Sequence, residues 1–164
     1  MSFTPHYIYA RVSEIPVEKL KSKGIKGVIL DVDNTLTTHD APQPSPWVRN
    51  WLDQLEQAGI KTMILSNNNK ERVLPFAEIL KLPFVAEGKK PLTIGYEKCA
   101  KLMGCAPNQL AMVGDQLFTD IWGGNRFGCM TILVEPIQEE TMFFFKAKRF
   151  IEKIVLKNIP RRQL

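Results

Sequence analysis

Acidic side chains cluster at two places along the chain. Asp31 and Asp33 stand one residue apart, directly after the apolar residues 27–30, and Asp115 and Asp120 follow a later apolar run. Carboxylates that lie close together raise one another's pKa unless a cation compensates them. Mg²⁺ takes oxygen ligands and typically only one or two protein carboxylates, which leaves positions for water and a substrate phosphate. The acidic residues therefore predict a magnesium site.

A second group of side chains suits an anionic substrate better than a metal. It comprises the hydroxyls of Thr35 and Ser66 and a lysine at position 89 or 90. Such groups donate hydrogen bonds or positive charge to a phosphoryl group. A carboxylate beside the phosphate can then attack phosphorus while another carries the proton of the leaving group. Spacing alone identifies neither the attacking aspartate nor the lysine.

These residues follow predicted strands. Apolar runs predict strands at residues 27–32, 60–65, 82–85, 110–113 and 129–134, and helical periodicity predicts helices at 47–58, 70–81, 93–103 and 118–127. Strands that alternate with helices favour a mainly parallel, five-stranded α/β sheet with helices on both faces, three layers in all. Ligands of such sheets bind at the carboxyl ends of the strands. The polar groups should therefore converge on one cleft.

Four motifs in order carry a family resemblance. They are DxDxT at residues 31–35, Ser66-Asn67, Lys90-Pro91, and GDxxxxD at residues 114–120. Together they resemble the motifs of the haloacid dehalogenase (HAD) superfamily of phosphatases, over about residues 25 to 135, and imply its Rossmann-like core. The stretches VILDVDNTL, MVGDQLFTDIWGGNRFG and TILVEP resemble the YqeG-type class IIIA branch, which is similar to the mitochondrial phosphatidylglycerophosphate phosphatases of fungi.

The resemblance implies roles for the acidic residues. Asp31 would be the nucleophile, and Asp33 the general acid/base whose backbone carbonyl also binds Mg²⁺. Asp115 would complete the metal set of Asp31, Asp33 and Asp115. Asp120 would orient neighbours such as Lys90 or a metal-bound water.

The resemblance also implies a phosphate-binding set. Ser66 and Asn67 would hold the phosphate, with Thr35 supporting the loop on the same side. Lys90 would act with the catalytic aspartates by pairing with the phosphate. Position 90 is chosen over Lys89 because Lys90 precedes proline, as in the family pattern.

The intervals between motifs predict an open site. Asp31 and Ser66 are separated by 34 residues, and Ser66 and Lys90 by 23. Neither interval has room for a cap domain of the kind that excludes water in many HAD enzymes. An open site suits a large or surface-held substrate, since the partner surface can cover it.

The C-terminal segment is basic and amphipathic. Residues 141–164 carry seven Lys or Arg against one Glu, within a chain that we expect to form a single domain, 1–164. A helix predicted over 139–157 would place Phe143, Ala147, Phe150, Ile151, Ile154 and Val155 on one face, with Lys146, Arg149, Lys153 and Lys157 opposite. Such a helix can lie on an anionic bilayer. With the resemblance, this leads to the hypothesis that the substrate is phosphatidylglycerophosphate.

Location and other functions are expectations of the same kind. The chain has no run of about 18 to 20 apolar residues and no signal-peptide pattern, which favours the cytoplasm and, for a lipid substrate, the inner face of the membrane. Phe145, outside the apolar stripe, could mark a homodimer contact. Soluble sugar phosphates or nucleotides are the alternative substrates. A nucleic-acid-binding module that uses the basic tail is the alternative from another class.

Overall fold

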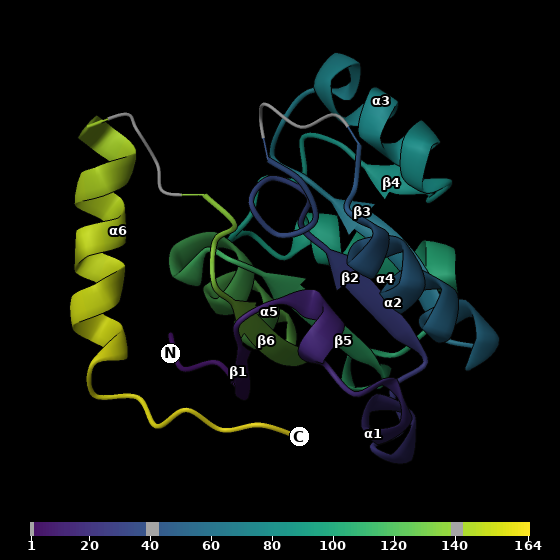
Figure 1. Ribbon diagram of the computed structural model, residues 1–164, viewed down its shortest axis with the longest axis horizontal. Coiled ribbons are helices and arrows are strands. Elements are labelled where there is room, and N and C mark those ends of the chain that lie inside the picture. Colours follow the sequence, from purple (N-terminus) through teal and green to yellow (C-terminus); the bar gives the residue numbers. More distant parts are fainter. Residues whose placement is uncertain (1, 39–42, 139–142) are drawn as a thin grey trace.

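A parallel sheet forms the centre of the molecule (Figure 1). The computed structural model describes residues 2–38, 43–138 and 143–164, with the side chains of 143–145 left out. Six strands lie in the order β1-β6-β5-β2-β3-β4, and every neighbouring pair is parallel. The strands are β1 (Tyr7–Tyr9), β2 (Gly27–Leu30), β3 (Lys61–Leu65), β4 (Phe84–Val85), β5 (Leu110–Gly114) and β6 (Met130–Val134).

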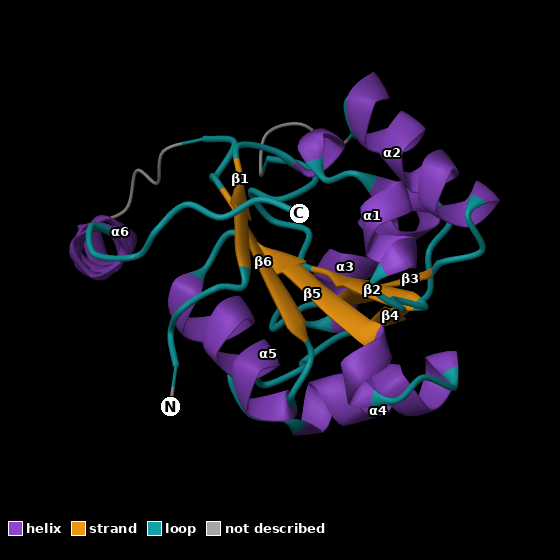
Figure 2. Cartoon of the chain, turned by 90° about the horizontal axis from the view of Figure 1, so that it is seen from below, coloured by secondary structure: helices purple, strands orange, loops and turns teal. Residues whose placement is uncertain are grey.

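Helices cover both faces of this sheet (Figure 2). One face packs against α1 (Val17–Ser22), α2 (Pro46–Gln57) and α3 (Lys70–Leu80), and the other packs against α4 (Ile94–Met103) and the start of α5 (Trp122–Phe127). The sequence dictates this arrangement through residue alternation. In β2, Val28 and Leu30 belong to the first core and Ile29 to the second, and all three are fully buried. A strand buried on both sides needs a continuous apolar run, as parallel sheets do.

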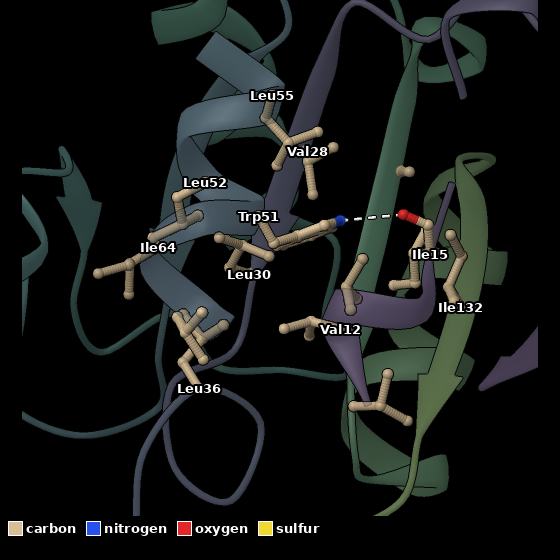
Figure 3. Packing of buried hydrophobic residues seen from close by; sticks show 14 of the residues in the cluster. Val12, Ile15, Val28, Leu30, Leu36, Trp51, Leu52, Leu55, Ile64 and Ile132 are labelled. Atoms are coloured by element: carbon tan, nitrogen blue, oxygen red, sulfur yellow. Dashed lines mark hydrogen bonds between the residues drawn. The ribbon is translucent and has the colours of Figure 1, made fainter. Parts of the chain in front are cut away.

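Trp51 anchors α2 to the sheet (Figure 3). Pro46 begins this helix, as its fixed φ favours, and Ser45 is the N-cap residue, although its side chain makes no capping bond. The indole of Trp51 is 1% exposed, and its Nε1 donates a hydrogen bond to the carbonyl oxygen of Ile15 at 3.1 Å. The bond ties α2 to the segment that follows the short 3-10 helix at Val12–Glu14.

The predicted parallel α/β sheet is confirmed, with one strand more than expected. β1 lies at the sheet edge and has only three residues, which is too short a run to give a clear sequence signal. The helix predicted over 118–127 is divided, because Leu117–Ile121 form a π-helical turn before α5 begins at Trp122. π-turns often accompany functional sites, since they redirect a side chain.

The C-terminal helix α6 (Phe143–Leu156) lies beside the sheet rather than on either helical layer (Figures 1 and 2). The first four residues of the predicted span, 139–142, fall outside the described residues, as does the side chain of Phe145. After α6 the chain returns to the body. The amide of Ile8 donates to the carbonyl of Arg162 at 2.8 Å, and the amide of Leu164 donates to the Tyr9 hydroxyl at 2.7 Å.

The described segments between the strands contain no cap domain, as the motif intervals predict. From the end of β2 to the start of β3 they form only a loop and α2, and from β3 to β4 only a loop and α3. No helix in the described part of the chain is long and apolar enough to cross a bilayer.

The Trp51 hydrogen bond gives a stability prediction. Trp51→Phe removes a buried donor and leaves the Ile15 carbonyl without it, so the free energy of unfolding should fall by about 2 kcal/mol. Trp47→Phe is the matched control. Because Trp47 is half-buried, this substitution should lower the free energy of unfolding by less than about 1 kcal/mol. Urea unfolding measures both. Equal losses in the two variants would contradict the role given to the buried bond.

Candidate active site

The site lies where the strand order reverses. β2 begins one half of the sheet and its neighbour β5 the other, and ligands of open α/β sheets bind at such a point. Leu30 and Val113 are register partners, and the amide of Asp31 donates to the carbonyl of Val113 at 3.0 Å. The residues that follow these strands, Asp31 and Asp115, are therefore brought together by the sheet itself.

Three buried carboxylates meet at this point. Asp31, Asp115 and Asp120 each offer an oxygen within 4.8 Å of the others. Their residues are 7%, 3% and 0% exposed, respectively. Water can compensate them little, so neighbouring groups must supply positive charge or donors.

Lys90 supplies one such charge. Its Nζ donates to Asp31 Oδ1 at 2.8 Å and to Asp120 Oδ1 at 2.7 Å, and the residue is 6% exposed. Burial alone would lower the pKa of Lys90, but Asp120 and Asp31 outweigh burial and raise it, so the amine stays charged. Lys89 is exposed, so Lys90 is the lysine of the pair that reaches the carboxylates.

Asn67 holds the backbone of Lys90. Its side-chain oxygen accepts from the Lys90 amide at 2.7 Å, and its Nδ2 donates to the Lys90 carbonyl at 3.0 Å. The Asn67 side chain thus positions the lysine. Its contact with phosphate stays a prediction.

Asp120 depends on a glycine. A Cβ at Gly114 would overlap the Asp120 carboxylate, so the close approach requires glycine there. The amide of Gln116 donates to Asp120 Oδ2 at 3.1 Å, and the Tyr96 hydroxyl donates to the Asp120 carbonyl at 3.0 Å. The π-helical turn places Asp120 among these donors and points its other oxygen at Lys90.

The loop after β2 arranges the remaining motif residues. Asn34 adopts a φ of 61°, which asparagine tolerates better than most residues, and its amide donates to the Thr37 carbonyl at 2.7 Å. Thr35 Oγ1 consequently donates to Asp115 Oδ1 at 3.3 Å. The Thr35 hydroxyl, which was predicted to belong to the phosphate-binding set, thus hydrogen-bonds a carboxylate of the acidic cluster.

Asn68 links Asp33 to Ser66 by hydrogen bonds. The sequence motifs assigned no role to this asparagine. Asn68 Nδ2 donates to Asp33 Oδ2 at 2.6 Å, and the amide of Asn68 donates to Ser66 Oγ at 3.1 Å. The cluster of three carboxylates contains Asp120, where the predicted metal set has Asp33. The backbone carbonyl of Asp33 remains its predicted contribution to a metal. The run of three asparagines that follows Ser66 was the available sequence signal for Asn68.

Arg149 reaches the cluster from α6, contrary to the prediction that it lies on a solvated basic face. Its Nη2 forms an ion pair with Asp115 Oδ2, its Nη1 donates to the Asp115 carbonyl at 2.6 Å, and its side chain is only 16% exposed. Glu152, 3% exposed, accepts from Arg149 at 3.1 Å and from the amide of Leu117 at 3.0 Å. Helical periodicity gave the angle of Arg149 around α6 but not which face of α6 packs inward.

Burial dominates the proton affinity of the cluster. It raises the pKa of Asp31 well above its usual value, with Lys90 opposing and Asp120 and Asp115 adding to the rise. It also raises the pKa of Asp115 to about 7, although Arg149 lowers it. Both carboxyl groups would ionise more readily with further positive charge beside them.

The residues fit a divalent cation. Asp31 Oδ2 is buried and has no hydrogen-bond partner among the described residues, while its other oxygen is held by Lys90. Three clustered carboxylates form an all-oxygen donor set, which suits a hard cation, and the unpartnered Asp31 Oδ2 stays open toward a substrate. Asp31 and Asp115 would hold the ion, and it would add the charge that lowers their pKa values.

The chain is similar in sequence to several known proteins. The family described as mitochondrial PGP phosphatase matches residues 1–138. "Probable phosphatase YqeG" of Bacillus subtilis is 36% identical over 160 residues, which cover 98% of this chain and 93% of that protein. "Phosphatidylglycerophosphate phosphatase 1, chloroplastic/mitochondrial" of Arabidopsis thaliana is 34% identical over 98% of this chain, which spans 49% of that longer protein.

Solved structures share the fold at low sequence identity. NagD from E. coli has a TM-score of 0.61 at 14% identity and covers 85% of this chain and 94% of its own. The cobalt-bound form of deoxy-D-mannose-octulosonate 8-phosphate phosphatase (YrbI) from Haemophilus influenzae has a TM-score of 0.53 at 20% identity, with 84% and 90% covered.

The pKa of Asp115 gives a pH prediction. In the folded protein the Asp115 carboxyl keeps its proton up to about pH 7, whereas in the unfolded chain it loses the proton near about pH 4. Between these two pH values the folded state binds the extra proton, so the stability of the metal-free fold falls as pH rises from about 4 to about 7. A cation needs the ionised form. The rise in Tm on adding MgCl₂ should therefore be small near about pH 5.5 and larger near about pH 8.

Asp115→Asn serves as the control for this measurement, because it removes the titrating ligand and should give little Mg²⁺ shift at either pH. Differential scanning fluorimetry measures each pair with and without the salt. A wild-type shift that is equal at both pH values, or larger at the lower one, contradicts the assignment.

Arg149 gives a second prediction, because it shares Asp115 with any cation bound there. Arg149→Gln should tighten Mg²⁺ binding about five- to tenfold, which corresponds to about 1 to 1.4 kcal/mol. Lys148→Gln is the matched control, since Lys148 also docks α6, donating to Gln116 Oε1 at 2.6 Å, but does not touch a carboxylate of the cluster. Titration calorimetry above the pKa of Asp115 measures both; unchanged or weaker binding in Arg149→Gln would refute the competition.

Proposed function

Because the chain belongs to the mitochondrial PGP phosphatase family of the HAD superfamily, we propose that it hydrolyses phosphatidylglycerophosphate to phosphatidylglycerol and inorganic phosphate. It is a HAD phosphatase, and a buried acidic cluster at its strand ends could hold a metal. The lipid substrate, the ion Mg²⁺ and the residue roles are the proposal. The observation that carries the chemistry is the unpartnered Asp31 Oδ2 beside Asp115, with Lys90 holding the other oxygen.

In the first half of the reaction Asp31 is the nucleophile. Lys90 fixes its Oδ1, so Oδ2 attacks phosphorus and forms an aspartyl-phosphate. The bond from phosphorus to the ester oxygen breaks, and protonated Asp33 donates its proton to the leaving alkoxide. Asn68 holds the Asp33 carboxyl at the edge of the site, where a leaving group would depart.

In the second half Asp33 acts as a base. It takes a proton from water, whose oxygen attacks the aspartyl-phosphate, and the bond from phosphorus to Asp31 breaks to release inorganic phosphate. Ser66 follows the carboxyl end of β3, and Lys90 lies in the loop after the neighbouring strand β4. The Ser66 hydroxyl and the Lys90 ammonium stabilise the negative phosphoryl oxygens in both halves of the reaction. Bound Mg²⁺ would supply further positive charge to those oxygens.

Three observations support a phospholipid as the substrate. The matched family and the Arabidopsis relative carry names for phosphatidylglycerophosphate hydrolysis. The described chain has no cap, so a large substrate can approach. The outer side of α6 exposes Phe150 by 64%, Ile151 by 51% and Ile154 by 48%.

Those exposed side chains have basic neighbours. Lys146 and Lys153 are exposed on the same helix, so its outer face combines aromatic and aliphatic groups with positive charge. A face of this kind suits the interface of an anionic bilayer. We place the protein as a peripheral enzyme on such a surface.

Asp31→Asn tests the nucleophile. The amide cannot form the aspartyl-phosphate, so phosphate release from an aryl phosphate should fall by about a thousandfold or more. Asp53→Asn is the control, because Asp53 is exposed on α2 and should retain wild-type rates. A malachite-green assay with and without Mg²⁺ reports the rates, and circular dichroism reports the fold. Near-normal turnover in folded Asp31→Asn would exclude Asp31 as the nucleophile.

The same assay tests the substrate class. Phosphatidylglycerophosphate in mixed micelles should give a higher kcat/KM than glycerol 3-phosphate, sugar phosphates and nucleotides. Preference for a soluble phosphomonoester would replace the lipid proposal and leave the phosphatase chemistry intact.

A further inference from the structure

The loop at residues 66–69 joins the end of β3 to α3 (Figure 1). Its last residue, Asn69, is the N-cap of the helix, because its backbone is extended and its side-chain oxygen accepts from the amide of Arg72 at 3.1 Å. This bond fixes the first turn of α3 beside the loop that carries Ser66 and Asn68. One short segment therefore positions both the proposed phosphate-binding hydroxyl and Arg72.

Arg72 lies beside the proposed general acid. Its Nη2 is 3.6 Å from Asp33 Oδ1, while Asn68 donates to the other oxygen of that carboxyl at 2.6 Å. The side chain of Asp31 is 10% exposed, that of Asp33 is 19% exposed and that of Arg72 is 44% exposed. Exposure thus rises from the nucleophile to the general acid and on to the guanidinium. A leaving group that departs at Asp33 meets Arg72 on its way to solvent.

A guanidinium in this place suits a phosphate. It carries several N–H donors in a planar fork, so one edge can face Asp33 while another binds phosphate oxygens. It also keeps its charge at any pH at which the enzyme works. The ion pair with Asp33 gives no sufficient reason for an arginine here, because a pair of this separation and exposure contributes little to stability.

We propose that Arg72 binds the second phosphate of the substrate, the phosphodiester that joins the leaving glycerol to the lipid, an inference that rests on the proposed function. Asp33 donates its proton to an oxygen of this glycerol, and one glycerol unit separates that oxygen from the phosphodiester. The phosphodiester therefore lies a few bonds beyond Asp33, on the side where the guanidinium of Arg72 is exposed. Glycerol 3-phosphate has the same leaving oxygen without the second charge, so Arg72 distinguishes the lipid headgroup from simple phosphomonoesters.

The test uses the deacylated headgroup, glycerophosphoglycerol phosphate, which keeps both phosphates and has no acyl chain. It is compared with glycerol 3-phosphate in the full chain with Mg²⁺. In Arg72→Gln the ratio of kcat/KM for the headgroup to kcat/KM for glycerol 3-phosphate should fall about five- to tenfold, because a charge-assisted bond to the phosphodiester is lost. An effect of Arg72 on Asp33 acts on the same leaving oxygen in both substrates, so it cancels in the ratio.

Arg49→Gln is the matched control. Arg49 is exposed on α2 and donates to the carbonyl of Ile79, near the other end of α3, at 3.4 Å. Its substitution removes the same charge and a contact with the same helix, and the ratio should equal that of the wild type. Arg72→Lys keeps the charge without the fork, so its ratio should fall between those of Arg72→Gln and the wild type. Circular dichroism reports the fold of each variant.

The outcomes separate this inference from the proposed function. An unchanged ratio in folded Arg72→Gln, or a fall no larger than in Arg49→Gln, refutes the phosphodiester contact and leaves the proposed function standing. Equal kcat/KM for the two soluble substrates in the wild type refutes the contact as well. The proposed function is read from phosphatidylglycerophosphate in mixed micelles, and it fails if the wild type prefers glycerol 3-phosphate, a sugar phosphate or a nucleotide to that lipid.

Discussion

The burial of like charges is the constraint on which the site depends. Asp31, Asp115 and Asp120 lie within 4.8 Å of one another in a region with little access to water. Two basic side chains compensate the three carboxylates. Lys90 binds Asp31 and Asp120, and Arg149 binds Asp115. The compensation is incomplete, since burial still raises the pKa of Asp31 and Asp115 and one oxygen of Asp31 has no donor among the described residues. An additional cation at this point would therefore bind where charge is missing.

The fold explains why these charges are close at all. β2 and β5 are neighbours in space although about 80 residues separate them in the chain, and their carboxyl ends place Asp31 and Asp115 side by side. Asn67 fixes the backbone of Lys90 from the end of β3, and Gly114 lets Asp120 approach. The apolar strands carry no catalytic group, but they hold the polar ones in place against mutual repulsion.

The strands of the sheet and the place of the site could be predicted because each depends on a short stretch of sequence. An apolar run such as residues 27–30 predicts a buried strand wherever it packs, and four motifs in order indicate one cleft. The edge strand β1 was missed because a run of three residues is too short to show a periodicity. The π-helical turn was missed because it has the apolar spacing of an ordinary helix start. The inward face of α6 could not be predicted, since Arg149 is buried by pairing with Asp115 across 34 residues of chain and not by its own hydrophobicity.

A structure determined with Mg²⁺ and beryllium trifluoride, a mimic of the aspartyl-phosphate, tests the central claim most directly. We predict beryllium bonded to Asp31 Oδ2, magnesium bound by Asp31 and Asp115, and the ammonium of Lys90 in contact with a fluorine. The mimic on another residue, or no cation between Asp31 and Asp115 at saturating Mg²⁺, would contradict the account.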